Sequence, residues 1–177
     1  ERHTPSQQIA HKLFLEKGWV PGKSLAARDN PDHKQMRSLF DDAFRPKRIA
    51  EIEGDVEKLA YELIDDFIDH RECDYVQQYA VPLPLFIICR QMGAKDEDVW
   101  QIKKWTDAWI KGGTIGLDEK GVVWATEMEI QAQHYFPAIF EKLRVQPDET
   151  LLSDLVNNEV PGWGRTLSDS ELHAEMM

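Results

Sequence analysis

The chain has 177 residues, the size of one domain, and 42% of them are hydrophobic, which is enough to bury a core. Its formal net charge of −11 argues against nucleic acid as the main partner, because phosphate binding requires a clustered basic surface. No apolar run approaches the roughly 20 residues that span a bilayer, and the N-terminus lacks the apolar core of a signal peptide. We therefore expect a soluble, cytoplasmic protein that binds neither nucleic acid nor membrane.

The first clear element is a helix that carries a histidine and an arginine. Asp29 and Asp32 are natural capping residues, and Pro31 suits a first helical turn. His33 and Arg37 lie four residues apart and share one helix face, where the pair can bind a single anionic group. A solvated surface pair is the alternative that this spacing alone leaves open.

Helical periodicity continues through the middle of the chain. Apolar residues recur every three or four positions over residues 46–70, which predicts a long amphipathic helix. Residues 73–76 have a strand-like composition and predict one short β-strand, which needs strands from elsewhere to form a sheet. Residues 79–92 carry two prolines and then an almost unbroken apolar run, which predicts a helix buried around most of its circumference.

Three more helices are predicted over residues 95–111, 118–143 and 150–157. Glycines within residues 112–116 separate the first of these from the second. Residues 167–171 have the pattern of a helix N-terminus, yet the helix they announce ends with the chain after barely two turns. We therefore expect the chain to be a piece of a longer protein.

The order of these features resembles the cytochrome P450 superfamily, specifically helix C to the start of helix I of a soluble bacterial haem-thiolate monooxygenase, over about residues 20–177. The stretch LAARDNPDHKQMRSLFDDAFRP resembles helix C, with its D-x-P-x-H-x-x-x-R pattern and F-x-P turn. The segment from Ile52 to Gly93 is similar to helix D, a short strand and helix E. KDEDVWQIKKWTDAW resembles helix F, and LSDSELHAEMM resembles the entry into helix I.

The resemblance implies a mainly α fold, helices C to H with one short β-strand, in a single partial domain over residues 1–177. The family's oxygen-activating acid and alcohol pair, its E-x-x-R motif and its F-x-x-G-x-x-x-C-x-G haem-ligand loop do not occur in the chain. Neither Cys73 nor Cys89 stands in the ligand context. We therefore expect no catalytic residue and no metal ligand here, and no activity from this chain by itself.

For the parent protein the resemblance implies a monooxygenase with haem (iron protoporphyrin IX) as its cofactor. Such an enzyme inserts one oxygen atom of O2 into an apolar organic substrate, with electrons from NAD(P)H delivered by a ferredoxin or flavoprotein. In the family a histidine and an arginine of helix C bind a haem propionate, and His33 and Arg37 match those positions. A half-buried propionate must be paired, and arginine offers a permanent charge in a planar fork.

The resemblance also implies substrate-binding and partner-binding residues. Trp109 and Ile110 match the end of helix F, where the family's substrate roof lies, and Ala26 precedes helix C near the pocket wall. For Trp109, core packing is an equally open reading, since aromatic residues at helical spacing are usually core. Three residues on the same helix are predicted to be core: Val99, Ile102 and Trp105.

Four basic residues around helix C are candidates for the surface that receives the electron donor: Lys34, Arg45, Lys47 and Arg48. A solvated helix end is the alternative interpretation. For the whole chain the alternative is a non-enzymatic helical protein, either a small-ligand-binding regulator or a partner-binding bundle. Such a regulator should open with a basic helix-turn-helix, which the first forty residues do not contain.

Overall fold

The structure, a computed structural model, describes residues 4–70, 72–113 and 117–177. Within these residues the chain forms eight α-helices and three short helical segments, and no β-strand. The helices are α1 (Pro5–Lys17), α2 (Asp32–Ala43), α3 (Pro46–Asp65), α4 (Pro82–Gln91), α5 (Val99–Gly112), α6 (Glu119–Val145), α7 (Leu151–Asn157) and α8 (Asp169–Met176). The short segments are η1 (Leu25–Ala27), η2 (Val76–Ala80) and η3 (Asp96–Asp98). The predicted mainly α fold is confirmed.

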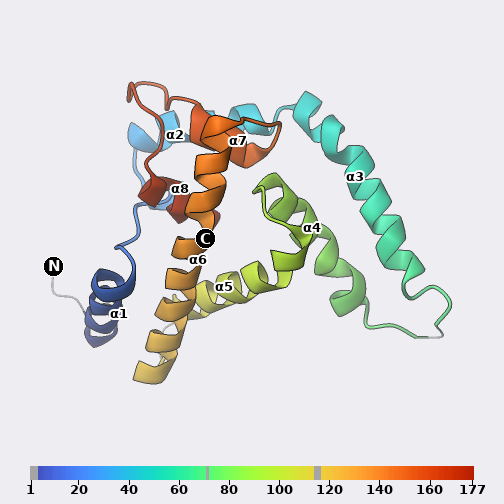
Figure 1. Ribbon diagram of the computed structural model, residues 1–177, viewed down its shortest axis with the longest axis horizontal. Coiled ribbons are helices and arrows are strands. Elements are labelled where there is room, and N and C mark those ends of the chain that lie inside the picture. Colours follow the sequence, from blue (N-terminus) through green and yellow to red (C-terminus); the bar gives the residue numbers. More distant parts are fainter. Residues whose placement is uncertain (1–3, 71, 114–116) are drawn as a thin grey trace.

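The long helix α6 is the centre of the packing. It contacts α1, α5, α7 and α8, and Figure 1 shows it running through the body of the molecule. Phe136, Phe140 and Leu143 of α6 are almost fully buried, at 1%, 0% and 1% exposure. Burying one such side chain contributes about 1.5–3 kcal/mol relative to leaving it exposed. The predicted core positions Val99, Ile102 and Trp105 of α5 are buried in the same cluster and are thereby confirmed.

Helix α2 begins at Asp32, with Pro31 at the N-cap position rather than in the first turn and with no side-chain capping hydrogen bond, and it buries one side against this core. Met36 and Leu39 are 0% and 5% exposed, and the helix packs on α7. His33 is only partly buried and Arg37 is exposed, as expected for positions one turn apart on the other side of the helix. The core packing of α2 therefore fixes the direction in which this pair points.

The predicted strand at residues 73–76 is wrong. Asp74 instead begins a helical turn: its carboxylate accepts the amide of Gln77 at 3.0 Å, and its carbonyl accepts the amide of Gln78 at 2.8 Å. Tyr75 stacks on Tyr79, with ring centroids 5.2 Å apart. Local capping by Asp74 outweighs the strand-like composition of Tyr75 and Val76, since no described segment offers a second strand to pair with.

Helix α3 is the least buried of the long helices. It ends at Asp65, five residues short of the predicted limit, and a turn follows. Figure 1 shows it reaching away from the body of the molecule, where it packs on α4 and η2. Leu59 is its one buried residue among those described. In the described part of the chain no helix is long and apolar enough to cross a membrane.

Candidate functional site

A cavity of about 440 Å³ lies where η1, α2, α5 and α8 meet. We call it the α2–α8 cavity. Its described lining is Ser24, Leu25, Ala26, His33, Arg37, Trp109, Ala174, Glu175 and Met177. Four of the predicted site residues, from three separate parts of the sequence, therefore line one space.

Arg37 and His33 supply the hydrogen-bond donors on one side of this cavity, and Arg37 carries a permanent charge. The Nε atom of Arg37 donates to the Asp41 carboxylate at 2.9 Å, and both side chains are 60% exposed. Its terminal amino groups make no further hydrogen bond with the described residues. An exposed ion pair of this kind is worth about 0–1 kcal/mol, so Arg37 can take a second carboxylate at little cost.

The opposite wall is apolar. It consists of Leu25 and Ala26 of η1, Trp109 of α5, and Ala174 and Met177 of the α8 region. Trp109 is 45% exposed, in contrast to Trp105 one turn earlier, which is 6% exposed. Core packing therefore does not account for Trp109. An arginine and a histidine facing an apolar wall suit an amphipathic ligand with a flat apolar body and carboxylate groups.

Glu175 ties the apolar wall together. Its Oε1 atom accepts the backbone N–H of Leu25 at 2.6 Å, which links η1 to α8 across the sequence. Burial raises the pKa of Glu175 above its ordinary value, although the Leu25 amide and nearby Arg28 act in the opposite direction. The sequence analysis did not select Glu175. Its position four residues after Glu171, on the same face of α8, was the available signal.

Glu171 makes a second link between α8 and the segment before α2. It accepts hydrogen bonds from Arg165 at 2.8 and 3.1 Å and from Arg28 at 3.3 Å. The Arg165 guanidinium is the largest cause that lowers the pKa of Glu171 to about 2. Both arginines also lie over the ring of Trp163, at 5.0 and 4.9 Å. This network holds η1 in place beside the α2–α8 cavity.

Ile110 lies outside the α2–α8 cavity. It lines a second cavity of about 530 Å³ between α1, the end of α5 and the first half of α6, which we call the α1–α6 cavity. Trp109 lines both cavities. The three predicted substrate residues are thus divided between two adjoining spaces, with Trp109 common to both.

Sequence comparison gives the family of the chain. No family model matches it. It is 30% identical over 150 residues to cytochrome P450 PksS of polyketide biosynthesis in Bacillus subtilis (strain 168), covering 85% of this chain and 35% of that protein. It is 35% identical over 148 residues to the methyl-branched lipid omega-hydroxylase of Mycobacterium tuberculosis (strain ATCC 25618 / H37Rv), covering 78% of this chain and 33% of that protein.

Solved structures of cytochromes P450 also match the fold of this chain. The structure of PksS matches 98% of this chain and 40% of its own length with a TM-score of 0.75 at 26% identity. P450BioI, in complex with an acyl carrier protein that carries hexadec-9Z-enoic acid, has a TM-score of 0.79 at 22% identity over 99% of this chain and 42% of its own. The chain belongs to the cytochrome P450 family. It spans about a third of the length of the curated P450s named here.

Neither cysteine of this P450 segment lines the α2–α8 cavity. Cys89 is 1% exposed within α4, and burial raises the pKa of its thiol to about 11. Cys73 is exposed and lies in the turn before η2. Among the described residues no three histidine, cysteine or acidic side chains gather closely enough to hold a metal ion.

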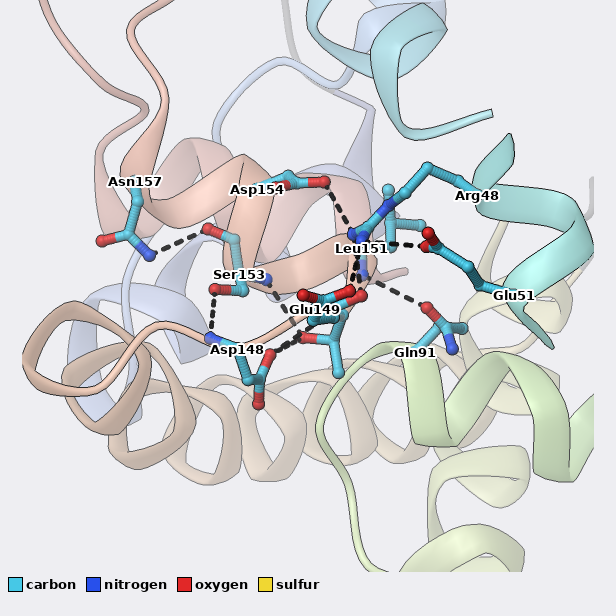
Figure 2. A network of polar contacts seen from close by, with 10 residues as sticks. Arg48, Glu51, Gln91, Asp148, Glu149, Leu151, Ser153, Asp154 and Asn157 are labelled. Carbon is cyan, nitrogen blue, oxygen red and sulfur yellow. Dashed lines mark hydrogen bonds and ion pairs between the residues drawn. The ribbon is translucent and has the colours of Figure 1, made fainter. Parts of the chain in front are cut away.

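The four predicted partner-binding residues have different surroundings. Lys34 and Lys47 are exposed, and Arg45 stands at the N-cap of α3. Arg48 is 24% exposed and points into a cluster of acids from two other segments, as Figure 2 shows. It donates to the Glu149 carbonyl at 2.7 Å and the Asp154 carboxylate at 3.1 Å, and also contacts Glu51 at 3.5 Å. Arg48 thus joins α3 to α7, and its charge is balanced within the molecule.

Proposed function

We propose that the parent protein is a haem-dependent monooxygenase that inserts one oxygen atom of O2 into an apolar organic substrate. The observation that carries the proposal is the α2–α8 cavity, where Arg37 and His33 face an apolar wall. Haem, when bound, supplies the oxygen-activating chemistry. The lining fits this group because a porphyrin is apolar over its faces and carries carboxylates at one edge.

His33 and Arg37 act as the propionate clamp in this proposal. The terminal amino groups of Arg37 bind the propionate, while its Nε atom can stay with Asp41. His33, one turn earlier on the same face, donates a second hydrogen bond. The two donors fix the edge of the haem at α2, and the apolar wall excludes water from its face.

The substrate lies against Trp109 and Ala26, with Ile110 at the approach to the cavity. An exposed indole and a small alanine leave room for an apolar guest beside the haem. A relative named for hydroxylation of methyl-branched lipids, at 35% identity, supports an apolar substrate class.

The thiolate ligand of the iron comes, in this proposal, from a part of the parent protein that this chain does not span. The remote positions of Cys73 and Cys89 support this, and the chain by itself is then inactive. Electrons come from NAD(P)H through an acidic ferredoxin or flavoprotein. That donor docks near Lys34, Arg45 and Lys47, with Arg48 supporting the surface through its acid cluster.

Carbon monoxide difference spectroscopy of the reduced full-length parent tests the function. A thiolate-ligated haem gives a red-shifted Soret band, and a histidine-type spectrum would overturn the proposal.

Arg37→Ala should weaken haem retention about tenfold. This is less than the loss expected for a fully buried pair, because Arg37 is 60% exposed. Lys34→Ala is the matched control, since it removes a charge from the same helix outside the cavity. Equal haem loss from both variants would reject the clamp.

A further inference from the structure

The α1–α6 cavity has an apolar lining and one ionisable side chain among its described residues. Helices α1 and α5 both pack on α6, and Figure 1 shows α1 beside the first half of α6. The described lining is Ser6, Gln7, Ala10, Phe14, Trp109, Ile110, Gly112, Gly113, Val122, Ala125, Thr126 and Glu129. Of these residues only Glu129 can carry a charge near neutral pH.

Two polar neighbours of Glu129 in the lining, Thr126 and Gln7, are already hydrogen-bonded. The hydroxyl of Thr126 donates to the Val122 carbonyl at 2.8 Å within α6. The side chain of Gln7 accepts the backbone amide of Thr4 at 2.8 Å in the capping box of α1. No described residue makes a hydrogen bond or an ion pair with Glu129 itself. Among the described lining residues the Glu129 carboxyl is therefore the one ionisable group, and it has no partner.

No nearby cation balances Glu129 within the described part of the chain. Lys111 of α5 lies over the ring of Trp124, 5.6 Å from its centroid, and Lys17 of α1 pairs with Glu127 at 2.6 Å. His11, the titratable residue of α1 next to Ala10, does not line the cavity. Burial alone raises the pKa of Glu129 to about 7. A carboxylate in such surroundings is costly until a cation pairs with it.

We propose that the α1–α6 cavity binds an amphipathic molecule with an apolar body and a cationic amine group, and that Glu129 is the residue that selects the cation. The apolar lining takes the body of the ligand, and Glu129 supplies its one strong polar contact. Because Trp109 lines both cavities, a ligand held here lies next to the α2–α8 cavity. If the ligand is the substrate of the monooxygenase, that role rests on the proposed function. The cation preference does not.

Isothermal titration calorimetry on the haem-loaded parent tests the preference with two probes of equal chain length. Decyltrimethylammonium keeps its charge at every pH and cannot ligate iron, and decanol is its neutral counterpart. At about pH 8 the cation should bind about tenfold more tightly than the alcohol. Glu129→Gln should remove this difference and leave decanol binding unchanged. Glu141→Gln is the matched control, because it removes the same charge from an exposed position on the same helix.

The pH dependence gives a second readout. Glu129, with its pKa of about 7, is mostly ionised above that value and mostly protonated below it. Cation affinity of the wild type should therefore fall about tenfold from about pH 8 to about pH 6, and the E129Q variant should show no such fall. Equal binding of both probes by the wild type, or an equal loss in E129Q and E141Q, would overturn the inference.

The two proposals fail separately. A normal haem spectrum with no cation preference overturns the role of Glu129 and leaves the monooxygenase proposal standing. A cation preference that depends on Glu129, in a parent without a thiolate-ligated haem, overturns the monooxygenase proposal alone. A melting curve of E129Q close to that of the wild type shows that lost binding is not lost folding.

Discussion

The α2–α8 cavity and the α1–α6 cavity share Trp109 but differ in their charged groups: the first has Arg37 and Glu175, and the described lining of the second has Glu129 alone. In the first, Arg37 is exposed and already paired with Asp41, so its charge is available at low cost. In the second, Glu129 is largely enclosed and has no partner among the described residues. The difference lies in the acid, because burial raises the pKa of Glu129 to about 7. The α2–α8 cavity is suited to a ligand with an anionic edge, and the α1–α6 cavity is suited to a different ligand with a cationic end.

The largest loss of stability is expected from a substitution in the core of α6, the helix that packs against lining elements of both cavities. Phe136 is 1% exposed at the centre of α6 and stacks with Phe140, so Phe136→Ala leaves a hole in the common core. We expect a loss of about 3–5 kcal/mol in the free energy of unfolding, measured by denaturant titration of the parent protein. Both cavities should lose ligand affinity together. Tyr61→Ala, at a position 61% exposed on α3, is the control and should change stability little.

The next effect should separate the two cavities. Glu171, whose side chain is 13% exposed, anchors Arg28 and Arg165 beside the α2–α8 cavity only. Because its pKa falls from 4.5 to about 2 on folding, its ionised form stabilises the protein above about pH 4.5, and this contribution is lost as the pH falls toward 2. Glu171→Gln should therefore cost up to about 3 kcal/mol near neutral pH and flatten the acid limb of the stability curve.

The measurement is the free energy of unfolding across that acid range in wild type and E171Q. Parallel curves for the two proteins would show that Glu171 is not the titrating group. The α1–α6 cavity should keep its ligand affinity in E171Q at neutral pH, since none of its described lining residues contacts Glu171.

A third variant addresses the wall between the cavities. Trp109→Ala should weaken ligand binding to both cavities about tenfold, because the same indole lines each of them. Stability should change less than in Trp105→Ala, since Trp105 is 6% exposed and Trp109 is 45% exposed. Trp100→Ala is the matched control: Trp100 lies on the same helix, is 49% exposed and lines neither cavity. Unchanged binding in the Trp109 variant would remove it from both sites.

The sequence predicted one cavity better than the other. His33, Arg37, Ala26 and Trp109 were selected through the family resemblance, and they line one space. Glu129 was missed because it is a single acid within a long amphipathic helix. Its spacing of three from Thr126, on the side of α6 that faces α1, was the only signal, and helical spacing cannot show that no cation faces it.

Two other positions show the limits of local patterns. Residues 73–76 predicted a strand from composition, yet capping by Asp74 decided the local structure. Arg48 was grouped with Lys47 by sequence proximity, whereas its partners Glu149 and Asp154 lie 101 and 106 residues away. Contacts at that separation depend on where the fold places the start of α7 relative to α3, and they cannot be read from the residues around Arg48.

The smallest effect is expected outside both cavities. Lys47 is exposed near the start of α3, so Lys47→Glu should leave the ligand affinities of both cavities unchanged. If this surface receives an acidic electron donor, reversal of the charge should slow haem reduction roughly threefold at low salt and very little at high salt. The reason is that salt screens exposed charges beyond about 8–10 Å. Stopped-flow reduction of the parent protein across a salt series measures this. Arg48→Ala is the contrasting variant, because the Arg48 side chain pairs with acids of its own chain: Glu51, Glu149 and Asp154. Its loss should lower the free energy of unfolding. The rate of haem reduction in this variant should depend little on salt. Equal reduction rates for wild type and Lys47→Glu at low salt would show that Lys47 is a solvated charge at a helix end.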